Sequence, residues 1–246
     1  MAHSIRIGIG GWTYEPWDKS FYPDDLAKKR QLEYASRQLT AIEINGTFYR
    51  LQKPDTYKKW AEQTPDGFQF ALKAHNYCMS RKTKDDMQQA VDTFLKSGAA
   101  ELGSRLGPIN WQFPPTRTFD ADYFKAFLGS LPKTHAKTDL RHAIEVRHES
   151  FRGNEAFADL LRQHECALVY SDSEEWPQDD IETAGFAYAR LQTSSEKYKA
   201  GYAPKALEQW AKTLKTWAQT RDIYVFFIAG AKQTNPAAAM ALIEKV

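Results

Sequence analysis

Four short apolar segments of this chain carry polar residues at alternate positions. The segments cover residues 41–45, 68–73, 109–113 and 143–147; in the first, Ile42 and Ile44 alternate with Glu43 and Asn45. Successive side chains of a β-strand point to opposite faces, so the acids, amides and bases of each segment share one face. Burying a polar group without a partner costs several kcal/mol. We therefore expect these strands to surround a polar site.

Strand-like and helical patterns alternate along all 246 residues. Predicted strands cover 5–10, 41–45, 68–73, 108–113, 142–147, 166–171, 186–192 and 223–229. Predicted helices cover 24–39, 54–63, 84–103, 120–131, 154–164, 176–183 (the weakest), 204–221 and 236–246. This alternation predicts parallel βα units, and eight units close a (β/α)₈ barrel of about 250 residues. We predict an α/β fold with a single TIM-type barrel domain over residues 1–246.

Composition and charge narrow the functional classes. The net charge is +2, so the overall charge of the chain does not favour nucleic acid as a partner. No apolar stretch approaches the ~18–20 residues that span a membrane, and residues 1–4 lead into a strand without a signal-peptide core. We expect a soluble cytoplasmic protein. Neither Cys78 nor Cys166 has zinc-ligand spacing, and Gly8–Gly11 lacks the GxGxxG spacing of a dinucleotide site, so we predict no cofactor.

Functional residues of a (β/α)₈ barrel lie at the C-terminal ends of its strands. The residues at these predicted ends that we expect to contact a ligand are Trp12, Tyr14, Asn45, Tyr49, Lys73, His75, Gln112, Arg147, Asp172 and Arg190. Glu43 and Glu145 are the candidate catalytic residues, through general acid/base chemistry. The structural alternative is that both acids form buried ion pairs with Lys73, Arg147 or Arg190. The same three basic residues can instead converge on an anion such as a phosphate or carboxylate.

A metal site would draw on Glu43, Glu145, His75, His148 and Asp172. The sequence contains no HxH or HExxH motif, and the neighbouring basic residues disfavour a divalent cation. We therefore predict no metal ligands.

Aromatic residues are dense in and after the first predicted loop. They are Trp12, Tyr14, Trp17, Phe21, Tyr22, Phe48 and Tyr49. They suit either a packed lid over the barrel mouth or a stacking platform for a base or sugar ring.

Several segments together resemble the DUF72 (YecE-like) family. They are residues 10–14 (GGWTY) with Trp17 and 21–23 (FYP), 43–49 (EINGTFY), Trp60 with 64–68 (TPDGF), 70–73 (FALK), 112–115 (QFPP), 145–151 (EVRHESF) and 188–191 (YARL). The resemblance implies a TIM barrel without an established activity, similar in architecture to barrel endonucleases and sugar isomerases.

Three segments depart from that family's pattern. Residues 79–81 (MSR) stand where members often have Thr-His, 190–193 (RLQT) where Arg-Leu-His-Gly is typical, and 227–230 (FIAG) where a Phe-Asn-Asn-like segment is usual. Imidazole or amide groups are thus missing from three positions at the mouth, whereas the predicted pocket residues are retained.

Three hypotheses follow. The first is an enzyme acting on a small anionic or phosphorylated ligand, with Glu43 or Glu145 as acid/base. The second is a non-catalytic ligand-binding protein that has kept the pocket and lost part of the chemistry. The third is a metal-dependent barrel enzyme, nuclease-like or isomerase-like; for nucleic acid, its contacts would come from Arg81, Lys82, Lys84 and the aromatic first loop, against the near-neutral charge.

Overall fold

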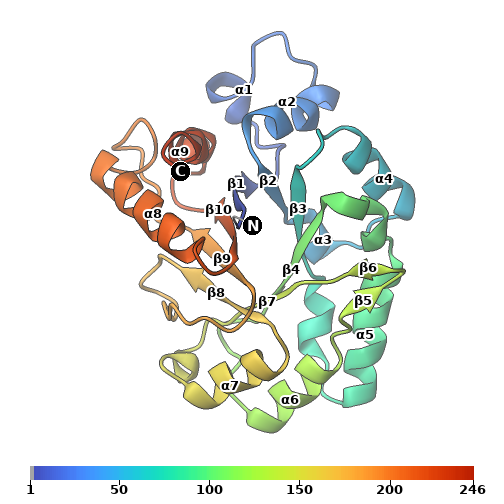
Figure 1. Ribbon diagram of the computed structural model, residues 1–246. Helices are drawn as coiled ribbons and strands as arrows, with labels where there is room; N and C mark the ends of the chain where they lie inside the picture. Colours follow the sequence, from blue (N-terminus) through green and yellow to red (C-terminus); the bar gives the residue numbers. More distant parts are fainter. Residues whose placement is uncertain (1–2) are drawn as a thin grey trace.

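Eight parallel strands close into a barrel in the computed structural model, which describes residues 3–246 (Figure 1). The strands are β1 (Ile5–Gly10), β2 (Ala41–Ile44), β3 (Gln69–Lys73), β4 (Leu106–Gln112), β7 (His142–Glu145), β8 (Ala167–Ser171), β9 (Phe186–Leu191) and β10 (Asp222–Phe227). Each strand pairs with its neighbour in chain order, and β10 pairs with β1 to complete the ring. The predicted TIM-type barrel is confirmed.

Most of the helices surround the barrel on its outside (Figure 1). They are α1 (Trp17–Ser20), α2 (Gln31–Gln38), α3 (Gly46–Tyr49), α4 (Pro54–Glu62), α5 (Lys84–Lys96), α6 (Ala121–Gly129), α7 (Glu155–Gln163), α8 (Pro204–Trp217) and α9 (Asn235–Ile243). Within residues 3–246, no helix combines the length and the apolar character needed to cross a membrane.

The structure differs from the predicted elements in three places. Helix α5 ends at Lys96, short of the predicted 103, because Gly98 adopts a left-handed conformation with φ of 118°. The prediction of a helix over 176–183 is wrong: this segment has no regular secondary structure, and its Asp180 accepts a hydrogen bond from Trp217 Nε1 at 3.0 Å. A short hairpin of β5 (Thr134–His135) and β6 (Thr138–Asp139), absent from the prediction, precedes β7.

The barrel wall separates two apolar layers. Ile42, Ile44 and Leu72 belong to the large outer layer between strands and helices, as their alternation predicts. The smaller inner layer combines alanines with larger rings, and its members are Ala41, Ala71, Ala143, Ala167, Val169, Phe186, Tyr188, Tyr224 and Phe226. At the N-terminal end of the barrel, Gln69 Oε1 accepts hydrogen bonds from Tyr224 and Arg6 at 2.5 and 2.9 Å. Polar contacts therefore fill that end.

Gly8 allows β1 and β2 to approach closely. A Cβ on Gly8 would lie 1.8 Å from the carbonyl oxygen of Ala41, a backbone atom that can move only with its strand. We expect Gly8→Ala to lower the free energy of unfolding by about 1–3 kcal/mol, measured by urea denaturation. Gly129→Ala is the control, because a Cβ there meets no atom within 4 Å. Equal stability of the two variants would contradict this view of the barrel wall.

Candidate functional site

Arg190 lies at the centre of a buried charge cluster inside the barrel. Its Nη2 donates to Glu43 Oε1 at 2.9 Å, and its Nη1 donates to Glu145 Oε2 at 2.7 Å. The three side chains come from β9, β2 and the end of β7, and each is at most 4% exposed. One guanidinium group thus joins two carboxylates that are 102 residues apart in the chain.

Each carboxylate has further partners. Arg147 donates to Glu145 Oε1 through Nε at 2.9 Å and Nη2 at 2.7 Å, and Asn110 Nδ2 donates to Glu145 Oε2 at 3.0 Å. Burial alone would raise the pKa of Glu145, but Arg190, Arg147 and the hydrogen bonds lower it to about 2. The buried hydroxyl of Tyr188 donates to Glu43 Oε2 at 2.7 Å. Burial and then the charge of Glu43 raise the pKa of Tyr188 well above 10, so it stays a donor.

Lys73, the last residue of β3, differs from the other charged residues of this cluster in its lack of an ion pair among the described residues. Among the described residues, the ion pairs of the cluster involve Arg147 and Arg190, and none includes Lys73. The Lys73 ammonium lies over the ring of Phe48, 4.0 Å from its centroid, and the residue is only 6% exposed. Burial and then the charge of Arg190 lower the pKa of Lys73 to about 8, against the opposing pull of Glu43 and Glu145.

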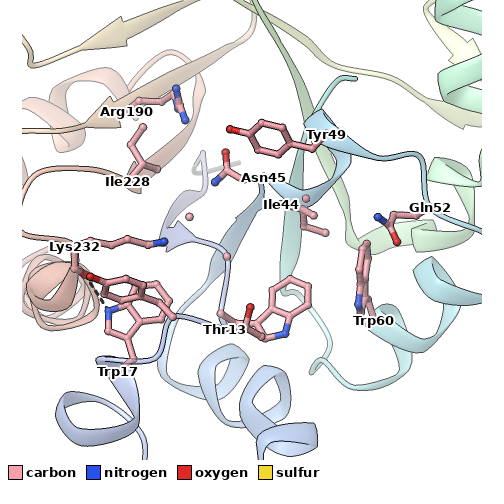
Figure 2. A pocket seen from close by; sticks show the side chains of 15 residues that line it. Thr13, Trp17, Ile44, Asn45, Tyr49, Gln52, Trp60, Arg190, Ile228 and Lys232 are labelled. Carbon is pink, nitrogen blue, oxygen red and sulfur yellow. Dashed lines mark hydrogen bonds between the residues drawn. The ribbon is translucent and has the colours of Figure 1, made fainter. Parts of the chain in front are cut away.

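A cavity of about 500 Å³ lies at the C-terminal ends of the strands (Figure 2). Its lining comes from the loop after β1, from the segment from β2 to α4, from β9 and from the loop after β10. These residues are Gly10, Gly11, Trp12, Thr13, Tyr14, Trp17, Ile44, Asn45, Gly46, Tyr49, Gln52, Trp60, Arg190, Ile228 and Lys232. Arg190 is the residue shared by the cavity and the charge cluster.

The aromatic residues of the first loop pack against one another and also line the cavity. Trp12 and Trp60 meet edge to face with ring centroids 5.4 Å apart, and Tyr14 meets Trp17 in the same way at 5.3 Å. Trp17 Nε1 donates to the carbonyl oxygen of Lys232 at 2.9 Å, the dashed line in Figure 2. The same aromatic residues can therefore form both the packed lid and the stacking platform that the sequence suggests.

The structure brings most of the predicted site residues together. Glu43, Glu145, Arg147, Arg190 and Gln112 are in contact, with Gln112 Oε1 3.3 Å from Arg190 Nη1. Lys73 lies beside them, and the four remaining residues of the mouth line the cavity: Trp12, Tyr14, Asn45 and Tyr49.

Two predicted ligand contacts lie elsewhere. His75 Nδ1 accepts a hydrogen bond from the backbone N–H of Tyr77 at 3.2 Å, and the residue lines a separate cavity beside α5. Asp172 accepts from the backbone N–H of Gln192 at 2.6 Å and from the hydroxyl of Tyr202 at 2.8 Å. Asp172 therefore ties the end of β8 to the loop after β9.

No group of three or more His, Cys, Asp or Glu side chains in residues 3–246 has an arrangement that could hold a metal ion. The two buried acids, Glu43 and Glu145, are bridged by the guanidinium group of Arg190.

Sequence reasoning missed several residues of the site. Tyr188 is two positions before Arg190 in β9 and therefore faces the same way, a signal that alternation alone could have given. Gln52 comes from a loop, Lys232 from a short 3-10 helix after β10, and Trp60 from α4, and no period points from these positions to the cavity.

Comparison with known proteins yields a family match over residues 6–246, to the model described as "Protein of unknown function DUF72". UPF0759 protein YunF of Bacillus subtilis is 30% identical over 152 residues, which are 60% of this chain and 52% of that protein. UPF0759 protein YecE of Escherichia coli K12 is 31% identical over 150 residues, 60% of this chain and 50% of that protein. The matched region spans about half the length of these curated relatives.

Solved structures share the fold. A DUF72 protein from Thermotoga maritima superposes with a TM-score of 0.75 at 21% identity, covering 99% of this chain and 98% of that one. A family 2 AP endonuclease from Brucella melitensis superposes with a TM-score of 0.55 at 10% identity, covering 94% and 96%. At these identities the likeness concerns the barrel architecture alone.

Proposed function

Since this chain belongs to the DUF72 family, whose description assigns no activity, we propose from its own geometry that the barrel mouth binds a small anionic ligand. The observation that carries this proposal is the buried ammonium of Lys73. Lys73 lies at the C-terminal end of a barrel strand, the residue is 6% exposed, and its ammonium has no carboxylate partner among the described residues. Active sites of this fold lie at that end.

The charge balance of the cluster supports an anion. Three cations, Lys73, Arg147 and Arg190, share the interior with two carboxylates, Glu43 and Glu145. One positive charge is therefore left over in a site where an uncompensated charge is costly. A bound anion would remove that cost, so the binding energy would come from compensating a charge that the fold already holds.

The two arginines are committed to the carboxylates. Both Nη atoms of Arg190 and two nitrogens of Arg147 donate to Glu43 or Glu145, and Arg147 also stacks on Trp176, 4.8 Å from its ring centroid. Lys73 is therefore the cation available to a ligand inside the barrel. Lys232, 4.4 Å from the centroid of the Tyr14 ring, is a second cation on the cavity wall.

The same geometry limits acid/base catalysis by Glu145. With a pKa lowered to about 2, Glu145 is ionised at neutral pH and has no proton to donate, and such a carboxylate is a weak base. Catalysis by Glu43 or Glu145 stays a prediction. In the anion-binding account, the role of both residues is to hold Arg190 and Arg147 in place.

Calorimetric titration with inorganic phosphate tests the proposal. We expect saturable binding to the wild-type protein and at least a tenfold loss of affinity in Lys73→Met, because a charge-assisted contact is worth about 1.5–3 kcal/mol. Lys125→Met, which removes an exposed lysine of α6, is the control and should bind as the wild type does. Absence of binding, or unchanged affinity in Lys73→Met, would refute the proposed function.

Anion affinity should depend on pH through Lys73. The lowered pKa of about 8 means that the ammonium is present below pH 8 and is lost above it. Affinity for sulfate, whose own charge is constant in this range, should be level below pH 7 and fall by up to about tenfold per pH unit above pH 8. A flat profile up to pH 10, measured by calorimetry, would contradict the role of Lys73.

A further inference from the structure

We infer, building on the proposed anion site, that the ligand also carries a hydroxylated ring, as a phosphorylated sugar does, and that this ring lies against the aromatic wall of the mouth cavity. The cavity, at about 500 Å³, is in the size range of small-molecule sites and far exceeds the space that a bare phosphate fills.

The two sides of the cavity carry different kinds of side chain. Arg190, where the cavity meets the charge cluster that contains Lys73, and Lys232 come from β9 and the segment after β10, and Figure 2 shows Arg190 and Lys232 on one side. Trp60 and Gln52 lie on the opposite side, with Tyr49 extending from α3 toward Asn45 (Figure 2). A ligand with an anionic group at one end and a ring at the other would match both sides.

Two indoles form the ring-binding part of this wall. Trp12 and Trp60 are both half-buried, and their rings stand at 82° to each other with centroids 5.4 Å apart. Their perpendicular planes make a corner, in which a ring can lie on one indole face while its edge meets the other. Aromatic faces favour such contacts with other rings and with C–H groups.

Uncharged polar groups beside the indoles point to hydroxyl groups on the ring. Thr13, Asn45 and Gln52 line the same cavity and supply hydroxyl and amide groups. Gln52 Nε2 donates weakly to the carbonyl oxygen of Arg50 at 3.2 Å, whereas its Oε1 has no donor among the described residues. A purely apolar ring would leave these groups without partners when it displaced water from them, which is unfavourable.

Substitutions of Tyr49 and Gln52 can test ligand binding without disturbing the fold. Tyr49 is 72% exposed although it is a large aromatic residue, and Gln52 lies in a loop. Neither belongs to the apolar core, so truncating them should leave the barrel intact.

Calorimetric titrations with glucose 6-phosphate, glucose, adenosine 5′-monophosphate and inorganic phosphate test this inference. We expect glucose 6-phosphate to bind at least tenfold more tightly than phosphate and more tightly than glucose or the nucleotide. Gln52→Ala and Tyr49→Ala should each weaken glucose 6-phosphate several-fold more than they weaken phosphate. Gln63→Ala is the matched control, because Gln63 also donates to a nearby backbone carbonyl but lies outside the cavity.

The outcomes distinguish this inference from the proposed function. Phosphate binding without any gain from the sugar ring, or a gain that survives both substitutions, would refute the ring site and leave the anion site standing. Tighter binding of the nucleotide than of the sugar phosphate would show that an aromatic base, and not a sugar ring, lies against the indoles, and would refute this inference. Failure of both phosphate and glucose 6-phosphate to bind would refute the anion site, and the ring site with it.

Discussion

Replacing Arg190 with methionine is expected to lower the free energy of unfolding by about 3–5 kcal/mol, because it removes one partner of a buried ion-pair network. Arg190 is the guanidinium shared by Glu43 and Glu145, which are both buried. Without it, Glu43 would keep only the hydroxyl of Tyr188 as a side-chain partner, and Glu145 would keep Arg147 and Asn110.

The loss should depend on pH. In the wild type the pKa of Glu145 is lowered to about 2, so its favourable contribution is present above pH 4.5 and disappears as the pH falls toward 2. Removing Arg190 removes much of what lowers that pKa, so the variant should come closer to the wild type in acid. Urea denaturation at pH 3 and pH 8 measures the difference. Arg37→Met, at an exposed ion pair with Glu33, is the control and should change stability little. An Arg190→Met protein as stable as that control at pH 8 would show that the cluster does not hold the barrel interior together.

Replacing Lys73 with methionine is expected to have the opposite effect, raising the free energy of unfolding by about 1–3 kcal/mol. Burial lowers the pKa of Lys73 from 10.5 to about 8, so the folded protein holds this proton less readily than the unfolded chain does. The ammonium therefore costs stability in full below pH 8, and the cost fades as the pH rises from 8 to 10.5. Methionine keeps the apolar stem over Phe48 without the charge.

This prediction couples stability to binding. Lys73→Met should be more stable than the wild type at pH 7 while losing phosphate affinity, and its advantage in urea denaturation should shrink toward pH 10. Lys125→Met should show neither change. A Lys73→Met protein that is destabilised at pH 7 would mean that the ammonium has a compensating partner, which would remove the main argument for an anion site.

Much of the fold follows from the sequence because its physical causes are local and periodic. The period of two in residues 41–45 and 143–147 places Glu43 and Glu145 on the inner face, and the number of strands closes the barrel. The segment 176–183 was predicted as a helix from weak signals, and its conformation depends on Asp180 meeting Trp217 of α8, 37 residues away. Such a contact has no local signature.

The sequence predicts which residues belong to the site better than it predicts which of them form ion pairs. Strand ends identified Glu43, Glu145 and Arg190, but only the closed barrel shows that Arg190 bridges both acids while Lys73 stays without a carboxylate. His75 and Asp172 also come at or after strand ends, yet their side chains satisfy nearby backbone N–H groups. Lys232 and Gln52 reach the cavity from the connecting segments after β10 and α3, whose course depends on tertiary packing.

The most direct test of the anion site is the pKa of Lys73, measured by NMR from the ¹³Cε and ¹⁵Nζ shifts of its side chain with and without inorganic phosphate, with Lys73→Met to assign the signal. We expect a pKa of about 8 in the free protein and a clear rise toward 10.5 when phosphate is added, because an anion stabilises the ammonium. A pKa near 10.5 in the free protein, or one that phosphate does not move, would contradict the anion site.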